Sequence, residues 1–255
     1  MLDSGDENST GRDGTVFADR ARSDDVSLPE VTVADRAAYV PAVDALVLAD
    51  LHLGRVRASR VEMPLGEHAE LLDRVAELLQ AHDPAQVVLA GDVVHAFDAV
   101  PYEVAQTVEA LAKTVADAGA DLSVVAGNHD TQLAALESVD PVPFHRLDSE
   151  TVVLHGHEEP PVAASRYLIG HEHPAITIEG QRRHCFLACP DQFGGAAVVV
   201  LPAFSRAAVG TTVNGRSAAD TMSPLLTALD RCRPIVPTAG QPLEFPPLGE
   251  LRDHL

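Results

Sequence analysis

Carboxylates, imidazoles and one amide recur directly after short apolar runs of this 255-residue chain. Five successive runs end in Asp, Asn or His, and one such residue alone would usually be structural. Five repetitions in order indicate a functional cluster. The residues are Asp50, His52, Asp92, Asn128, His129, Asp130, His155, His157, His171 and His173.

A mixed set of oxygen and imidazole donors suits divalent ions of intermediate softness, such as Mn²⁺, Zn²⁺, Fe²⁺ and Ni²⁺. Two such ions about 3.5–4 Å apart share a bridging carboxylate and hold a hydroxide between them. Metal binding lowers the pKa of water from about 15.7 to near 7, which provides a nucleophile at neutral pH. The pattern therefore indicates metal-dependent displacement at a phosphate ester.

The elements that must position these residues begin with three apolar runs, at 45–50, 86–92 and 121–130. Apolar residues at three-to-four spacing predict a helix over 67–81. A second helix is expected after Pro101, a favourable first-turn residue, and Gly119 closes it. Strands that alternate with helices predict an α/β fold with parallel strands, whose carboxyl ends bind ligands.

The second half contains short apolar runs at 151–157, 166–171, 175–180, 184–189 and 196–202, with little helix between them. They predict a second, mainly antiparallel sheet. The segment from Pro224 holds one possible short helix and then becomes proline-rich. We therefore expect a sandwich of two mixed sheets flanked by helices over 36–255 as a single domain, with 1–35 as a mobile acidic N-terminal tail.

The charge balance is strongly acidic, with 18 Lys+Arg against 38 Asp+Glu and a formal net charge of −20. A hydrophobic content of 46% is too high for a disordered acidic chain. The composition disfavours a nucleic-acid binder that depends on charge alone. The chain has neither a membrane-length apolar run nor a signal-peptide pattern, so we expect no membrane association and a cytoplasmic protein.

Lysine is almost absent, because Lys113 is the only one in the chain. An acidic surface can attract cationic partners, or it can reflect adaptation to concentrated salt, where the Debye length falls to about 3 Å at 1 M. Specific binding does not require the replacement of lysine everywhere, so the second interpretation, a halophilic cytoplasm, is favoured.

Three cysteines, Cys185, Cys189 and Cys232, cannot form a disulfide framework, and the odd count suggests a reducing compartment. Cys185 and Cys189 follow His184, which faintly resembles a metal cluster. No second Cys/His pair accompanies them at zinc-finger spacing, so the segment is interpreted as a buried strand.

The ordered motifs resemble those of calcineurin-like metallophosphoesterases, which implies a metallophosphoesterase-like sandwich. They are DLH at 50–52, GD at 91–92, GNHD at 127–130, HGH at 155–157 and GHEH at 170–173. Four segments resemble those of a narrower group: residues 48–55, the Arg60…Pro64 stretch, GDVVH at 91–95 and residues 201–214. This group comprises compact archaeal and bacterial phosphoesterases related to the nuclease subunit SbcD/Mre11, whose bacterial relatives accompany DNA-repair ligase and helicase genes.

The resemblance implies two divalent ions, with Mn²⁺ preferred over Zn²⁺, Fe²⁺ or Ni²⁺, and a ligand for each position. Asp50, His52 and His173 would hold the first ion, Asn128, His155 and His171 the second, and Asp92 would bridge them. His129 lies where the family places its general acid, and an unperturbed imidazole pKa near 6.5 suits that role. Asp130 would orient and stabilise protonated His129.

Some assignments stay open at this stage. Either imidazole of HGH could be the ligand, with His155 favoured because it precedes the glycine, and His157 then solvated or behind the ligand. His95 is a candidate phosphate contact or a surface histidine. Arg55 and Arg206 could bind phosphate or be exposed structural residues. Glu172 alternates away from the ligands beside it and is not counted among them.

The expected function is a dinuclear metal-dependent phosphodiesterase that uses hydroxide attack on a nucleotide or nucleic-acid diester. A first alternative is a nuclease subunit in a DNA-repair helicase or ligase complex. A second is a non-enzymatic scaffold with a retained metal site, although such a chain would be expected to have lost ligands. The sequence does not determine the oligomeric state.

Overall fold

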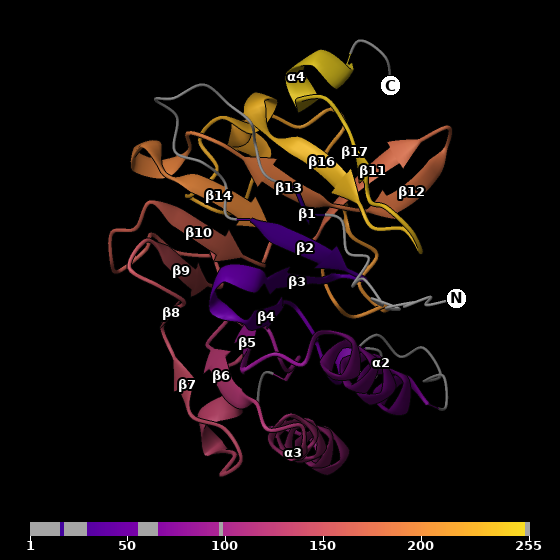
Figure 1. Cartoon of the computed structure of the whole chain (residues 1–255), viewed down its shortest axis with the longest axis vertical. Helices are drawn as coiled ribbons and strands as arrows, with labels where there is room; N and C mark the ends of the chain where they lie inside the picture. Colours follow the sequence, from indigo (N-terminus) through magenta and orange to yellow (C-terminus); the bar gives the residue numbers. More distant parts are fainter. Residues whose placement is uncertain (1–15, 18–29, 56–65, 97–98, 253–255) are drawn as a thin grey trace, which may run out of the picture.

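The computed structural model describes residues 16–17, 30–55, 66–96 and 99–252. Its first sheet has seven strands in chain order, β1 to β7 (Figure 1). Pairing is antiparallel from β1 to β4 and parallel from β4 to β7, so the sheet is mixed. The strands are β1 (Val16–Phe17), β2 (Val31–Ala34), β3 (Ala37–Val40), β4 (Ala45–Leu48), β5 (Gln86–Ala90), β6 (Asp121–Val125) and β7 (Pro141–Val142).

The second sheet also has seven strands, in the order β17-β16-β13-β14-β10-β9-β8. Its central strands β9, β10 and β14 are mutually parallel, whereas the flanking pairs are antiparallel. The prediction of a mainly antiparallel sheet is confirmed, since four of the six pairings are antiparallel, although the parallel pairs at the centre were not predicted. The strands are β8 (His145–Arg146), β9 (Thr151–Leu154), β10 (Arg166–Ile169), β13 (Phe186–Cys189), β14 (Ala197–Val200), β16 (Arg233–Val236) and β17 (Leu243–Glu244).

The run at 175–180, predicted in the second sheet, belongs instead to a third, smaller sheet. β11 pairs antiparallel with β12 and parallel with β15. The strands are β11 (Pro174–Ile178), β12 (Gln181–His184) and β15 (Thr211–Thr212). The hairpin of β11 and β12 projects from the edge of the molecule (Figure 1).

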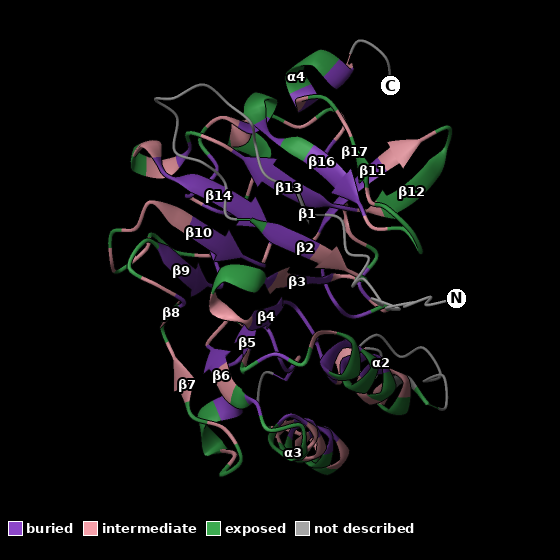
Figure 2. Ribbon diagram, viewed as in Figure 1, coloured by how far each residue is buried: buried purple, intermediate pink, exposed green. Residues whose placement is uncertain are grey.

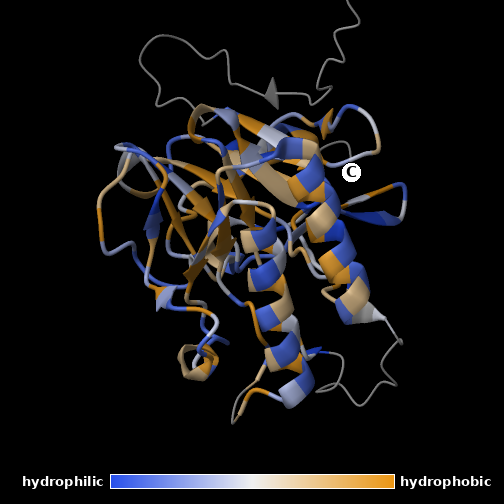
Figure 3. Ribbon diagram, turned by 60° about the horizontal axis from the view of Figure 1, so that its bottom comes forward, coloured by the Kyte–Doolittle hydropathy of each residue, from blue (hydrophilic) through white to orange (hydrophobic). Residues whose placement is uncertain are grey.

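Two long helices cover the outer face of the first sheet, α2 (Glu67–His82) and α3 (Tyr102–Asp117) (Figure 1). Their apolar residues alternate with polar ones along the ribbon (Figure 3). The buried stripe of α3 contains Val104, Val108 and Leu111, which belong to one core cluster with Leu46 and Leu89 of the sheet. The helical periodicity therefore predicted both helices correctly.

The main core lies between the two large sheets. Alternate residues of each strand enter it, such as Val47 of β4 and Val88 of β5 against Leu168 of β10 and Val199 of β14. Both sheets are coloured as buried along their centres (Figure 2). Because both faces of each sheet are covered, the strands are continuous apolar runs rather than alternating ones.

The C-terminal segment covers the outer face of the second sheet. Its buried residues include Leu225, Leu229, Leu248 and Leu251, which pack against the face that contains Val198. α4 (Leu248–Leu251) is the short helix at that end. The segment also contributes β16, which includes Pro234 and pairs with β13. No strand was predicted there, and a proline is not typical of a strand with neighbours on both sides.

The predicted boundary at residue 35 falls inside the first sheet. β2 lies on its N-terminal side and pairs with β3, so the turn between them contains Asp35 and Arg36. The proposed tail therefore contains at least β1 and β2, and this boundary is corrected. Residues 1–15 and 18–29 lie outside the described part, as do Arg60 and Pro64. No helix among the described residues is both long and apolar enough to cross a membrane.

A disulfide joins Cys189 to Cys232, and Cys185 is a buried free cysteine. One bond is not a framework, as expected, but the reducing compartment suggested by the odd cysteine count did not predict this pair. β13 pairs with β16 so that Ala188 lies opposite Arg233, and the next residues along the two strands are the bonded cysteines. Spacing could not reveal the pair because the second strand was not predicted.

We predict that the disulfide stabilises the domain, because a bond across 43 residues removes entropy from the unfolded chain. Replacing Cys189 and Cys232 together by Ala should lower the free energy of unfolding by about 2–4 kcal/mol. Denaturant titration with and without dithiothreitol measures this. The reductant should act on the wild type and on Cys185→Ala but not on the double variant. Three titratable thiols in the unreduced, denatured protein would contradict the prediction.

Candidate metal centre

The segments that follow β4 and β5 continue side by side beyond the sheet. The amide of Asp50 donates to Gly91 O (3.1 Å), and that of His52 donates to Asp92 O (2.9 Å). Further along, the amide of Leu53 donates to Val93 O (2.9 Å). These bonds fix the DLH and GD motifs against each other, so their side chains share one edge of the sandwich.

Five of the predicted ligands have left-handed backbone conformations. Their φ values are 55° for Asp50, 46° for His52, 50° for Asp92, 68° for His171 and 46° for His173. A left-handed conformation costs an L-residue about 1–2 kcal/mol, so non-glycine residues rarely adopt it. Such strain concentrates at functional sites, where the surrounding structure enforces it.

Two motif glycines allow the loops to approach each other closely. A Cβ at Gly127 would lie 2.3 Å from the Asp92 amide nitrogen and from its Oδ1. A Cβ at Gly170 would lie 2.6 Å from Asp50 Oδ2. A side chain at either position would displace a carboxylate of the cluster.

A first group of donors consists of Asp50, His52 and His173. Nε2 of His52 lies 3.0 Å from Nε2 of His173, which is 3.2 Å from Asp50 Oδ1. Ligand atoms about 2.1 Å from one ion at right angles are about 3.0 Å apart. Asp50 and His52 are almost completely buried. These three residues and Asp92 each offer a ligand atom, all within 4.8 Å of one another.

A second group is centred on Nε2 of His155. That atom lies 3.1 Å from Asn128 Oδ1 and 3.2 Å from His171 Nδ1. The other ring nitrogen, Nδ1, lies 3.1 Å from the carbonyl oxygen of Ala90. When Nδ1 donates its proton to that carbonyl, the lone pair of Nε2 faces the cluster, as in a metal-binding imidazole. The structure thus brings His155 into the cluster.

Asp92 lies between the two groups and turns one carboxylate oxygen toward each. Oδ2 is 3.8 Å from His52 Nε2, and Oδ1 is 3.4 Å from His155 Nε2. Oδ1 also accepts a hydrogen bond from the amide of His129 (3.0 Å). The donor set therefore fits two divalent ions that share one carboxylate.

Burial and neighbouring charges keep two of the predicted imidazole ligands, His52 and His171, neutral, which is the form that binds metal. Burial lowers the pKa of His52 to about 3, and nearby cationic groups add to the effect. Burial and the neighbouring His155 lower the pKa of His171 to about 4. His173 differs, because the adjacent Asp50 carboxylate outweighs burial and raises its pKa.

The two carboxylates respond oppositely to burial. Burial raises the pKa of Asp92, and the charge of Asp50 adds to this increase. The surrounding histidines outweigh burial at Asp50 and lower its pKa. Two buried carboxylates in one cluster need positive charge close by, which divalent cations would supply.

A family model for calcineurin-like phosphoesterases matches residues 44–184, a range that includes every member of the donor cluster. The chain belongs to the calcineurin-like phosphoesterase family. It is accordingly a metal-dependent hydrolase of a family that uses divalent metals.

The fold is similar to that in the crystal structure of Pseudomonas putida nuclease MPE. The two chains are 24% identical, the match covers 87% of this chain and 96% of that one, and the TM-score is 0.63. YfcE, a phosphoesterase from E. coli, is 19% identical with a TM-score of 0.42, over 68% of this chain and 84% of that one. A search of curated proteins finds no match.

Two further histidines of this phosphoesterase lie at the mouth of the cluster. The ring of His129 is 5.6 Å from that of His52, and its Nε2 is 3.9 Å from Asp92 Oδ2. Its side chain is 25% exposed, so a substrate can reach it. The ring of His95 lies 4.6 Å from that of His129, which places His95 at the centre rather than on a remote surface.

Asp130 has a different role from the one expected. Its Oδ1 accepts a hydrogen bond from the amide of Val94 (3.0 Å), and its Oδ2 accepts one from the amide of Gly127 (2.9 Å). The predicted orientation of His129 by this carboxylate is therefore replaced by a link between the GD and GNHD loops. Its near-complete burial supports that positioning role.

The remaining candidate residues differ in whether their side chains lie near the donor cluster. Arg206 pairs with Glu70 (2.5 Å), whereas the charge of Arg55 lowers the pKa values of buried His52 and of His95, so Arg55 lies near the cluster. Glu172 accepts hydrogen bonds from the amides of Met222 and Ser223 (2.6 Å each) and points away from the ligands, as expected. His157 lies next to a predicted ligand, with its ring centre 5.2 Å from that of His155.

Sequence reasoning missed Arg74, which positions the loop beside Asp50. Its guanidinium lies 3.9 Å from the centre of the Phe204 ring, donates to Phe204 O (2.9 Å) and pairs with Asp35 (2.6 Å). The amide of Ser205 donates to Asp50 O in turn (3.3 Å). The position of Arg74 beside Val75, inside the apolar stripe of α2, could have indicated a buried arginine with a structural role.

We predict that Asp130→Asn lowers the free energy of unfolding by about 1–3 kcal/mol, because charged hydrogen bonds to two buried loops are weakened. Thermal or denaturant unfolding measures the change. Asp140→Asn, at an exposed carboxylate with the same change in charge, should have almost no effect. Equal stability of the two variants would contradict the positioning role.

Proposed function

We propose that this protein is a dinuclear metal-dependent phosphodiesterase. Asp50, His52 and His173 would hold one ion, and Asn128, His155 and His171 the other, with Asp92 between them. The observation that carries the proposal is the position of the Asp92 carboxylate, which presents one oxygen to each imidazole group at 3.8 and 3.4 Å.

Two bound divalent ions would supply a hydroxide nucleophile at neutral pH and neutralise the phosphoryl oxygens. The chain's own residues would do the rest. His129 is partly exposed at the mouth of the cluster, where protonated imidazole can donate to the departing oxygen. His95 and Arg55 are our candidates for contacts with the non-bridging oxygens, because both lie beside His52. Arg206 is not proposed for this role, since it is paired.

The proposed substrate is a phosphodiester of a nucleotide or nucleic acid. The narrower sequence resemblance to SbcD-related phosphoesterases supports this choice, and the similar fold of a nuclease agrees with it. The alternative of a nuclease subunit shares the same chemistry, and a repair helicase or ligase partner stays a prediction from sequence. The scaffold alternative is disfavoured, because the chain has retained every predicted ligand as well as His129.

Hydrolysis of bis-p-nitrophenyl phosphate in high KCl tests the proposal. Mn²⁺ is our preferred ion, and Zn²⁺, Fe²⁺ and Ni²⁺ are compared with it because availability can decide which ion occupies such a site. Turnover should disappear after chelation and return when metal is added. Absence of turnover in protein shown by elemental analysis to hold two ions would falsify the proposal.

Two variants should separate catalysis from metal binding. His129→Ala should keep two ions per chain but lose about 10²–10⁴-fold in turnover, the usual contribution of general acid–base catalysis. Asp92→Ala should lose the ions themselves, because both groups share that carboxylate. Metal content and turnover are measured on the same samples.

The matched controls are His82→Ala on α2 and Asp121→Ala at the start of β6, both outside the donor cluster. Each should keep metal content and turnover near the wild-type values. Loss of metal from His129→Ala would contradict the role assigned to that imidazole, and full occupancy of Asp92→Ala would contradict the bridge.

We infer further that the protein works in a salt-rich cytoplasm, on the basis of its −20 charge and single lysine. Self-repulsion should then lower the melting temperature when KCl is reduced from molar to millimolar concentration, because screening is lost. Calorimetry in both buffers measures the difference. Equal melting temperatures would be incompatible with salt adaptation.

A further inference from the structure

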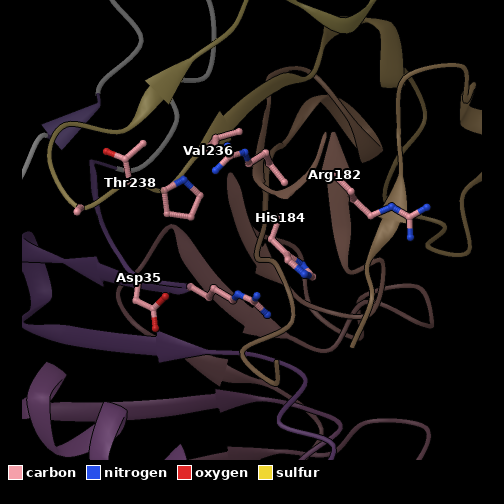
Figure 4. Close-up of a pocket in the computed structure, with 9 residues that line it drawn as sticks. Asp35, Arg182, His184, Val236 and Thr238 are labelled. Carbon is pink, nitrogen blue, oxygen red and sulfur yellow. The ribbon is translucent and has the colours of Figure 1, made fainter. Parts of the chain in front are cut away.

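A cavity of about 550 Å³ lies between the β11–β12 hairpin, the β2–β3 turn and the segment after β16. Figure 4 shows Arg182 and His184 on one side, Val236 and Thr238 on another, and Asp35 on a third. Three of the nine residues that line it are arginines, in a chain with only 18 Lys+Arg among 255 residues. The lining is therefore basic on an otherwise acidic protein.

The three arginines of the cavity form no ion pair with a described carboxylate, unlike five arginines elsewhere in the described part of the chain. Five arginines of the described residues form ion pairs with carboxylates: Arg74, Arg166, Arg206, Arg231 and Arg252. Within the described part of the chain, no carboxylate lies within 4.0 Å of the guanidinium of Arg36, Arg182 or Arg183. The one acidic residue of the lining, Asp35, is already paired with Arg74.

The positive charges also act on one another. Burial and the charge of Arg74 lower the pKa of Arg36 to about 10. Burial, with the charges of Arg36, His173 and Arg182, lowers the pKa of His184 to about 4. His184 is therefore neutral at pH 7 and would contact phosphate as a hydrogen-bond donor, whereas an anion beside Arg36 would offset the repulsion from Arg74.

Two elements that line the cavity are linked to the metal centre through the backbone. On one side, His184 pairs with Ala175, two residues after the predicted ligand His173. On the other, Nη1 of Arg36 donates to Ala203 O (3.2 Å) and Ser205 O (2.8 Å), and the amide of Ser205 donates to Asp50 O. The cavity thus adjoins the centre on the side of the first donor group.

We propose that Arg36, Arg182, Arg183 and His184 bind the phosphate backbone of a nucleic-acid strand whose scissile diester lies at the metal centre. This rests on the proposed function and narrows its substrate to a strand rather than a mononucleotide. A mononucleotide diester has only the phosphate that the metal centre itself engages. Additional guanidinium groups in an adjoining cavity serve a substrate with further phosphates.

The proposal also explains how so acidic a protein can bind a polyanion. Arg182 and Arg183 are exposed neighbours on β12, at the edge of its sheet, so their side chains leave opposite faces of the strand. A strand of nucleic acid that crosses this edge can reach both. Arginine matches phosphate oxygens with two parallel N–H groups. The remaining surface would repel the strand and thus restrict it to this track.

The test compares Arg182→Gln/Arg183→Gln with the wild type. Anisotropy of a labelled twelve-nucleotide phosphorothioate single strand, with Mn²⁺ and varied KCl, measures binding. Loss of two phosphate contacts should weaken binding about tenfold at the lowest salt and reduce the slope of log K against log salt by about 1.4. The control Arg146→Gln/Arg231→Gln has the same change in charge at exposed residues outside the cavity and should bind as the wild type.

Hydrolysis of thymidine 5′-(p-nitrophenyl phosphate), which has only one phosphate, separates the outcomes. Its kcat/KM should be the same in the double variant as in the wild type. Strand binding identical to wild type would overturn the inference, as would an equal loss of kcat/KM on the mononucleotide. Failure of the wild type to hydrolyse any diester would refute the proposed function instead, since strand binding is measured without turnover.

Discussion

The metal centre depends on the hydrogen-bonded continuation of β4 and β5 beyond their sheet. Because the amides of Asp50 and His52 donate to Gly91 and Asp92, two carboxylates are held in one buried cluster. Like charges in a dry environment repel each other, so this arrangement needs cations or protons to be stable. Left-handed turns at the strand ends add conformational strain. The charge repulsion and the backbone strain therefore occur at the same edge of the fold, which is typical of a functional site.

The second sheet completes the cluster only because its central strands are parallel. β9 and β10 pair with Leu154 opposite Ile169, so His155 and His171 leave the sheet side by side. In an antiparallel pair the same two ends would lie at opposite edges. The connection between them is long enough to return the chain to the start of the next strand. Arg74 and Arg36 then secure the loop at 203–205 against Asp50.

The distribution of charge is as important as its total. A net charge of −20 describes the whole chain, whereas a substrate responds to the field where it binds. Five of the described arginines are paired with carboxylates, whereas the three that line the cavity are not. The metal centre and this cavity together would form a continuous region that attracts phosphate. The acidic remainder of the surface would then help to exclude anions from unproductive positions.

The sequence alone determined both long helices, the eight strands that form the long apolar runs and the identity of the clustered residues, because apolar periodicity and motif spacing are local properties. The fold class followed from these. Only the tertiary structure decided that β9, β10 and β14 are parallel, that β16 joins the second sheet through a proline-containing strand, and that Cys189 bonds to Cys232. It also placed Asp130 on backbone amides and assembled the basic cavity from three distant segments. Each of these depends on contacts between residues far apart in the chain, which strand pairing establishes and spacing does not encode.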